Sequence, residues 1–269
     1  WIADRPYPLF IAATVIFSGS CGLLELLLSP IVNSVPTEEK TKALSMLHAF
    51  YCWGVIFVVL VSTVALRLLG SDRWQFVMLL WIIVPIIDFF MFLKVPLAPP
   101  VPEEKRQGFS QLCNKKIFLL LCFAILCGAA SELAVAQWAS AFVEKGLGVS
   151  KLFGDIVGVC GFALMMGVGR VILGKKGGSE KIDLNIVLMV CFAMSAVFYV
   201  VAALSGSSAV SLIACAVTGL SVSTLWPGML VAATRVYPLA GAWMFAVMSG
   251  FGDTGGAAAP WLAGKIADA

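Results

Sequence analysis

The feature that most constrains this sequence is its series of long apolar stretches. A helix that crosses a bilayer needs about 20 mostly apolar residues, and eight stretches meet this requirement. They lie at about 8–35, 43–66, 74–96, 117–143, 152–173, 184–204, 209–236 and 241–262. The sequence therefore predicts an all-α integral membrane protein that crosses the lipid bilayer many times.

The composition excludes several other classes. Of the 269 residues, 61% are hydrophobic and 12% are charged, whereas a soluble domain has about 45–50% apolar and about 25% charged residues. The net charge is only +3, and no long basic block is present that could follow a phosphate backbone. A soluble enzyme, a disordered chain and a nucleic-acid-binding protein are therefore not expected.

Cysteine and histidine give no sign of a metal or cofactor site. The chain has eight Cys, but none forms a CxxC pair of the kind used in zinc ribbons and redox dithiols. His48 is the only histidine, and although Cys52 follows it by one helical turn, no third group completes a nucleophilic site. We expect buried, inert thiols, no metal, no cofactor and no enzymatic activity.

One long polar segment, residues 97–116, divides the apolar stretches. It is rich in proline at its start and carries Glu103, Glu104, Lys105 and Arg106. We expect residues 1–96 to form three helices of one bundle, 97–116 a linker, and 117–269 five helices of a second bundle. If the first helix enters from outside, the loops on the linker side carry eleven Lys and Arg residues against six on the other. The positive-inside rule then places the linker in the cytoplasm. We expect a multi-pass protein of the plasma membrane.

Ionisable groups within the apolar stretches are candidates for function, since such groups cost several kcal/mol in lipid unless they are paired or hydrated. They are Glu25, Asp88, Glu132, Asp253 and Arg170. For Asp88 and Asp253, whose neighbours are apolar or glycine, a structural role is at least as plausible as a functional one. Arg170 lies near a helix end, where it could act as a gate. The alternative is that its side chain only extends to water at the membrane surface.

Glu25 belongs to a polar stripe along its helix. Ser18, Gly22, Glu25, Ser29 and Asn33 recur at spacings of three or four residues, which places them on one helical face. Such a face must meet water or protein, and an acid there can exchange a proton or bind a hydroxylated solute. A structural acid that is hydrogen-bonded between helices is the alternative.

Glu132, Gln137 and Trp138 suggest a sugar site. A carboxylate, an amide and an indole are the groups that bind sugars, because the indole stacks on a ring face and the polar groups fix the hydroxyls. Trp138 suits a packing or lipid-interface position equally well. Further along, Trp226–Pro227 predicts a break within the apolar stretch 209–236.

A faint internal repeat links two helix pairs about 200 residues apart. In each pair a glycine-rich helix is followed by a proline and then by a second helix with a glycine near its middle. The first set is Gly19, Gly22, Pro36 and Gly54, and the second is Gly219, Ser223, Pro238 and Gly252 or Gly255. Transporter folds are built from repeated halves of this kind.

Together these residues resemble the major facilitator superfamily, and within it the fucose-permease-like sugar:proton symporters. The matching motifs are Gly22–Glu25 with Pro30, Leu47–Phe50 with Gly54, Glu132–Trp138, Gly169–Arg170 with its basic loop, Gly219–Pro227, and Gly250–Pro260. The resemblance implies a major-facilitator-type bundle in which the eight segments are helices four to eleven of twelve, so that this sequence would be a fragment of a longer chain.

The resemblance also implies a function. We expect a monomeric secondary transporter that moves a small hydrophilic solute, such as a sugar, by proton-coupled alternating access. Its solute site would comprise Glu25, Asn33, Glu132, Gln137 and Trp138, with Glu25 coupling protons and Arg170 gating. The alternatives are an efflux antiporter for amphipathic compounds and a sensor of the same fold that binds solute without transporting it.

Overall fold

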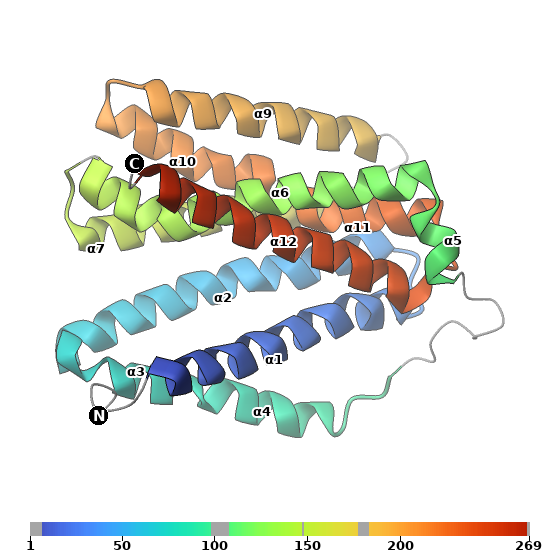
Figure 1. Ribbon diagram of the computed structural model, residues 1–269, viewed down its shortest axis with the longest axis horizontal. Helices are drawn as coiled ribbons and strands as arrows, with labels where there is room; N and C mark the ends of the chain where they lie inside the picture. Colours follow the sequence, from blue (N-terminus) through green and yellow to red (C-terminus); the bar gives the residue numbers. More distant parts are fainter. Residues whose placement is uncertain (1–6, 98–107, 147, 177–182, 268–269) are drawn as a thin grey trace.

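The computed structural model describes residues 7–97, 108–146, 148–176 and 183–267, and the regular elements in these ranges are all helical (Figure 1). The α-helices are α1 (Tyr7–Ser34), α2 (Lys40–Leu69), α3 (Trp74–Trp81), α4 (Ile83–Phe92), α5 (Phe109–Cys113), α6 (Lys116–Ala141), α7 (Lys151–Phe153), α8 (Gly161–Lys176), α9 (Leu184–Leu204), α10 (Ser208–Val222), α11 (Leu225–Val236) and α12 (Gly241–Ala267). A 3₁₀ turn, η1 (Ser71–Arg73), precedes α3, and two π-helical turns, η3 (Phe142–Gly146) and η4 (Gly154–Cys160), lie between α6 and α8.

Seven of the eight predicted membrane spans are confirmed as helical segments that are long and apolar enough to cross a bilayer. They are Tyr7–Ser34, Lys40–Leu69, Trp74–Phe92, Lys116–Gly146, Gly154–Lys175, Leu184–Leu204 and Ser208–Val236. The eighth predicted span forms α12, a helix of 27 residues. Because α12 is rich in glycine and contains Asp253, it is less apolar than the other seven and stays a predicted span.

Two of the spans are broken where the sequence places a proline. The stretch from Ser208 to Val236 forms α10 and α11, which meet at Ser223 and Thr224, so the predicted break near Pro227 is confirmed. Pro227 lies in the first turn of α11, where its missing N–H would have had no acceptor within the helix. The span between Trp74 and Phe92 is interrupted at Ile82 in the same way, shortly before its own proline.

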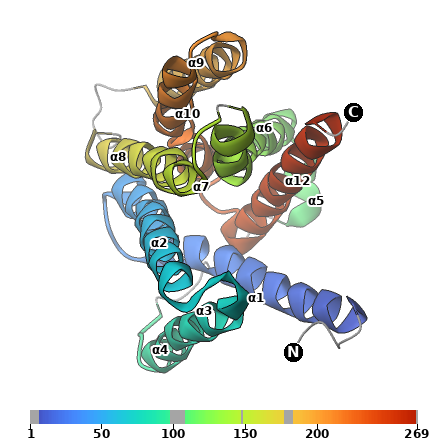
Figure 2. The ribbon, with the colours of Figure 1, turned by 90° about the vertical axis from the view of Figure 1, so that its left-hand side faces the viewer.

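The helices form two groups that lie side by side (Figures 1 and 2). Helices α1 to α4 make up one group and α6 to α12 the other. The most extensive pairing between them is α2 with α8, followed by α1 with α12 and α2 with η4. The predicted linker 97–116 connects the groups and contains the short helix α5. Its residues 98–107, including the charged run 103–106, lie outside the described residues. The domain boundaries at 96 and 117 stay a prediction.

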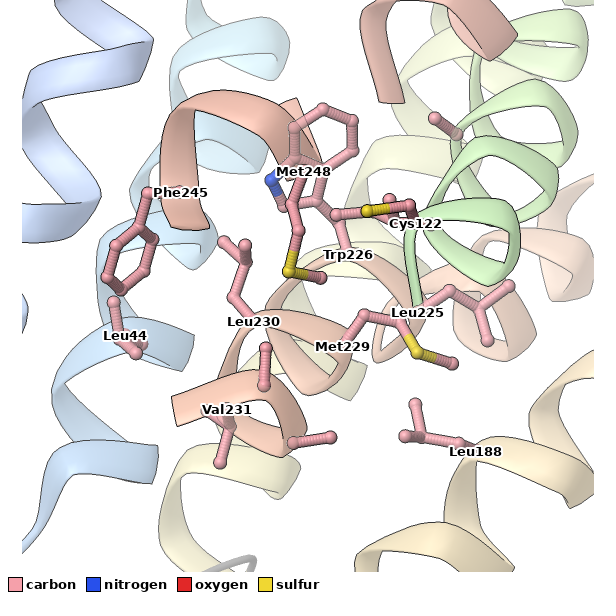
Figure 3. Close-up of a cluster of buried hydrophobic side chains, with 14 of the residues drawn as sticks. Leu44, Cys122, Leu188, Leu225, Trp226, Met229, Leu230, Val231, Phe245 and Met248 are labelled. Carbon is pink, nitrogen blue, oxygen red and sulfur yellow. The ribbon is translucent and has the colours of Figure 1, made fainter. Parts of the chain in front are cut away.

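A cluster of buried hydrophobic side chains surrounds α11 (Figure 3). Nine consecutive residues of α11, from Leu225 to Ala233, are buried. The cluster also includes Leu44 of α2, Leu188 of α9 and Met248 of α12. This short helix therefore packs against α2 of the first group as well as against α9 and α12 of the second.

Helices α6 and α12 make the most extensive pairing in the described structure, and glycine permits it. A Cβ atom on Gly255 would collide with the backbone carbonyl of Leu126 on α6. Any larger residue at this position would push the two helices apart, as expected for close packing of membrane helices at small residues. The seam between α6 and α12 is thus a rigid part of the second group.

Candidate functional site

A central cavity of about 520 Å³ lies between the two groups. Helices α1 and α2 form one wall, and α6, α8, α11 and α12 form the other. Most of the lining is apolar. The lining residues are Cys21, Leu24, Glu25, Leu28, Ser29, Leu47, His48, Phe50, Tyr51, Ala129, Glu132, Leu133, Arg170, Trp226 and Asp253.

The deepest polar feature of this cavity is an ion pair between Glu132 of α6 and Arg170 of α8. Nη2 of Arg170 donates to both carboxylate oxygens of Glu132, at 2.9 and 2.8 Å. Both residues are buried, with exposed fractions of 6% and 2%. Removing one partner of such a pair would leave an uncompensated buried charge, so each residue requires the other.

Each of the three guanidinium nitrogens of Arg170 has an acceptor in the protein. Besides the two bonds to Glu132, Nε donates to the carbonyl oxygen of Ser223 at 3.1 Å, and Nη1 donates to the carbonyl oxygen of His48 at 2.9 Å and to Sγ of Cys52 at 3.2 Å. The two oxygens of Glu132 share the contact with Nη2, and the other two nitrogens are bound by backbone carbonyls and a thiol. The guanidinium is therefore held mainly by the protein.

These contacts join segments from both groups of helices. His48 and Cys52 lie on α2 in the first group, whereas Glu132 and Ser223 lie on α6 and between α10 and α11 in the second. The ring of Tyr51 on α2 also lies 5.8 Å from Cζ of Arg170, within the range of a cation–π contact. The guanidinium thus holds α2 against the second group.

Glu25 faces the same cavity from α1 without such partners. It lines the cavity, yet it has no hydrogen-bond or ion-pair partner among the residues that the structure describes. Asp253 of α12 lines the cavity in the same unpaired way. Since Arg170 is already neutralised by Glu132, the described cavity carries two acids that have no basic side chain as a partner.

The five residues predicted for the solute site separate in the structure. Glu25 and Glu132 line the central cavity. Gln137 and Trp138 line a second hollow instead, farther along α6. Asn33 lies at the end of α1, where its backbone carbonyl accepts a hydrogen bond of 2.6 Å from Nζ of Lys40. Of the predicted polar stripe, Glu25 and Ser29 reach the cavity.

Sequence reasoning missed the pairing of Glu132 with Arg170. It treated one as a solute ligand and the other as a gate, although an unpaired charge in an apolar stretch is costly. One acid and one base on consecutive spans was the signal that could have identified the pair. Asp253 and the aromatic ring of Tyr51 were also missed as cavity residues, whereas Asp88 is exposed on α4 and does not line the cavity.

His48 is a further cavity residue. Its Nε2 atom is buried without a hydrogen-bond partner among the described residues, and its carbonyl group binds Arg170. In the described part of the chain no group of three His, Cys, Asp or Glu side chains is placed to hold a metal ion.

A multi-helix membrane bundle with a charged cavity between two groups of helices is the arrangement typical of a membrane transporter. The family model for the Major Facilitator Superfamily matches residues 1–268. The match covers nearly the whole sequence, and the chain belongs to this superfamily. No curated protein matches the sequence. Members of the superfamily are generally transporters rather than enzymes, and they cross the membrane many times.

Proposed function

We propose that this transporter moves a small hydrophilic solute, most readily a sugar, together with protons by alternating access. The solute would bind in the central cavity between the two groups of helices. The observation that carries this proposal is Glu25, a carboxyl group that faces the cavity without a partner among the described residues. The similarity to fucose-permease-like symporters supports the same solute class.

Glu25 is the proposed site of proton coupling. A carboxyl group in apolar surroundings can bind and release a proton under physiological conditions, and the leucines that line this cavity provide such surroundings. Glu132 is less suited to the task because both of its oxygens are already bound to Arg170. Proton binding would neutralise Glu25 on α1. The neutral cavity could then close on one side of the membrane and open on the other.

Arg170 is the proposed gating residue. Its contacts to His48 and Cys52 on α2 hold the two groups of helices together. Any motion that separates α2 from α8 must break these contacts, whereas the ion pair to Glu132 lies within the second group and can persist. The gate would therefore open by loss of the α2 contacts, with Glu132 keeping the guanidinium neutralised.

The domain organisation follows from the same proposal. Residues 1–96 would belong to one half of the fold and 117–269 to the other. The linker 97–116 would lie in the cytoplasm. The protein would be a monomer in the plasma membrane. The turn between α1 and α2, helix α5 and the turn between α11 and α12 lie at one end of the bundle (Figure 1). The described basic residues at these connections are Lys40, Lys42, Lys115, Lys116 and Arg235, and their charge supports a cytoplasmic position.

One observation favours a second candidate function, the exchange of protons for amphipathic cations. The lining of the cavity is mostly apolar, and Phe50, Tyr51 and Trp226 contribute aromatic rings. Aromatic faces attract organic cations, and Glu25 and Asp253 could balance their charge. Competition by tetraphenylphosphonium for the transported solute would distinguish this function from sugar symport.

The test uses the product of the complete gene in cells that lack their own sugar permeases. Hexoses, deoxyhexoses and pentoses are added singly while the external pH is recorded. We expect alkalinisation with one sugar class, its loss in Glu25→Gln, and its persistence in the control Asp88→Asn, because Asp88 is an acid of the bundle that does not line the cavity. Sugar accumulation without proton movement would contradict the coupling, and binding without any flux would identify a sensor.

A further inference from the structure

A second hollow lies beside the seam between α6 and α12. It has a volume of about 360 Å³ and is hereafter the outer hollow. Its lining residues are Gln137, Trp138, Ala141, Ala257, Pro260 and Trp261. In contrast to the central cavity, none of these residues is charged, and two of the six are tryptophans.

The outer hollow continues the central cavity along the same helical ridges. Residues four apart on a helix form one ridge of its surface, and on both helices such a ridge begins in the central cavity and ends in the outer hollow. On α6 the ridge is Ala129, Leu133, Gln137 and Ala141, and on α12 it is Asp253, Ala257 and Trp261. From Asp253 to Trp261 the helix rises about 12 Å at its usual 1.5 Å per residue.

Within the outer hollow one indole is fixed and the other is accessible. Nε1 of Trp138 donates to the carbonyl oxygen of Pro260 at 3.0 Å, and the ring of Trp138 lies so close to Gly264 that a Cβ there would come within 2.9 Å of it. Trp261 is 62% exposed, and its indole has no hydrogen-bond partner among the described residues. Trp138 therefore holds the shape of the hollow, and Trp261 offers a free ring face.

Gln137 completes the chemistry of the outer hollow. Its amide group both donates and accepts hydrogen bonds, and it has no partner among the described residues. An amide beside an aromatic face suits a neutral ring that carries hydroxyl groups, because the apolar face of that ring stacks on the indole while a hydroxyl meets the amide. No lining residue offers a charge to balance an ion.

We propose that the outer hollow is a second solute subsite for neutral hydroxylated rings, which the solute occupies on its way between the central cavity and the membrane face at the Ala141 end of α6. This inference rests on the proposed function, since it requires a transported sugar. It assigns stacking to Trp261, hydrogen bonding to Gln137 and a positioning role to Trp138. Two of the predicted solute-site residues, Gln137 and Trp138, thus belong to a separate binding step.

The test measures initial sugar uptake against concentration for the full-length protein, with the sugar that gives the highest uptake in the panel described above. Trp261→Ala should raise KM about fivefold for loss of one stacking contact, with an unchanged maximal rate. Trp261→Phe, which keeps a ring, should restore most of the affinity. Trp243→Ala is the matched control, because Trp243 is exposed on the same helix but lines neither the cavity nor the hollow.

A second arm separates this subsite from proton coupling. Sugar exchange without a proton gradient is measured in the Glu25→Gln background, where the increase in KM caused by Trp261→Ala should persist. If the wild-type protein carries sugar but Trp261→Ala leaves KM unchanged, or lowers only the amount of protein in the membrane, Trp261 is a lipid-facing residue and the inference falls while the proposed function stands. An effect on tetraphenylphosphonium transport but not on sugar would overturn the assigned ligand class.

Discussion

Helices α1 and α12 share several features but differ in their surroundings. Each is long, each contains at least two glycines, and each presents one unpaired acid to the central cavity, Glu25 on α1 and Asp253 on α12. Yet Ser29 is the only buried residue on α1 among those described, whereas α12 is buried at eight positions. Among the described residues, the two acids thus face one cavity from a helix with one buried position and from a helix with eight.

The glycines show the same difference. On α12, Cβ atoms at Gly252 and Gly255 would collide with Trp226 and with the backbone of α6, whereas at Gly19 and Gly22 of α1 they would meet nothing within 4 Å. The internal repeat pairs Gly19 with Gly219 and Gly54 with Gly252 or Gly255, and these pairs differ in the same way. A Cβ at Gly54 would also meet nothing within 4 Å, whereas one at Gly219 would collide with the backbone carbonyl of Phe162. A glycine permits close approach, but a neighbouring helix must be present before it has that effect.

The largest effect should follow from breaking the ion pair in the tightly packed group. Glu132→Ala leaves Arg170 buried without its counter-ion, and removal of one buried partner costs about 3–5 kcal/mol. We expect a strong loss of thermal stability in detergent and no transport. The double variant Glu132→Gln with Arg170→Met, which removes both charges, should recover much of the stability but not the gating, and equal stability of the two variants would contradict a required pair.

The next largest effect tests the two helices directly. Gly255→Ala places a methyl group against the carbonyl of Leu126, and overpacking of this kind costs about 1–3 kcal/mol. Gly22→Ala, its matched control on α1, meets open space and should be neutral or stabilising by up to about 1 kcal/mol, because alanine favours a helix more than glycine does. Thermal unfolding in detergent measures both, and equal effects would show that the two helices are packed alike.

A smaller effect concerns access to the cavity wall that α1 forms. Cys21 is exposed and lines the central cavity, whereas Cys52 is buried beneath Arg170. We expect a hydrophilic maleimide to modify Cys21 and to leave Cys52 unmodified, as quantified peptide by peptide with mass spectrometry. The transported sugar at saturation should slow modification of Cys21. An unchanged rate would argue that the solute does not reach this wall.

The smallest effect is expected at a surface ion pair. Lys42 and Glu39 lie 2.8 Å apart, but their side chains are 49% and 66% exposed. Exposed pairs contribute about 0–1 kcal/mol, so Glu39→Gln should change the unfolding temperature by little. A loss comparable to that of Glu132→Ala would contradict the distinction between buried and exposed pairs in this protein.

Much of the fold could be predicted from the sequence because apolar length and proline position are local signals. The spans followed from runs of about 20 apolar residues, and the break before Pro227 followed from its missing N–H. Helix α12 was harder to assign, since its glycines and Asp253 lower its hydropathy while allowing it to pack against α6. The sequence also gave no sign of the π-helical turns that precede α8.

The candidate site was less predictable because it depends on which helices become neighbours. Glu25 reached the expected cavity because a polar stripe marks one face of α1. Gln137 and Trp138 follow Glu132 in sequence, but they lie about 8–9 Å farther along the axis of α6 at 1.5 Å per residue, so they line another hollow. The partners of Arg170 are backbone carbonyls and a thiol, and such acceptors carry no signal in a sequence.

The most direct test of this account uses the purified protein in liposomes with an imposed pH gradient. Wild-type protein and the control Asp88→Asn should accumulate the sugar against its gradient when the outside is acidic. Glu25→Gln should lose accumulation but retain exchange of labelled for unlabelled sugar, because the cavity and its Glu132–Arg170 pair remain intact. Accumulation by Glu25→Gln at the wild-type level would contradict the central claim that this unpaired acid couples protons to the solute.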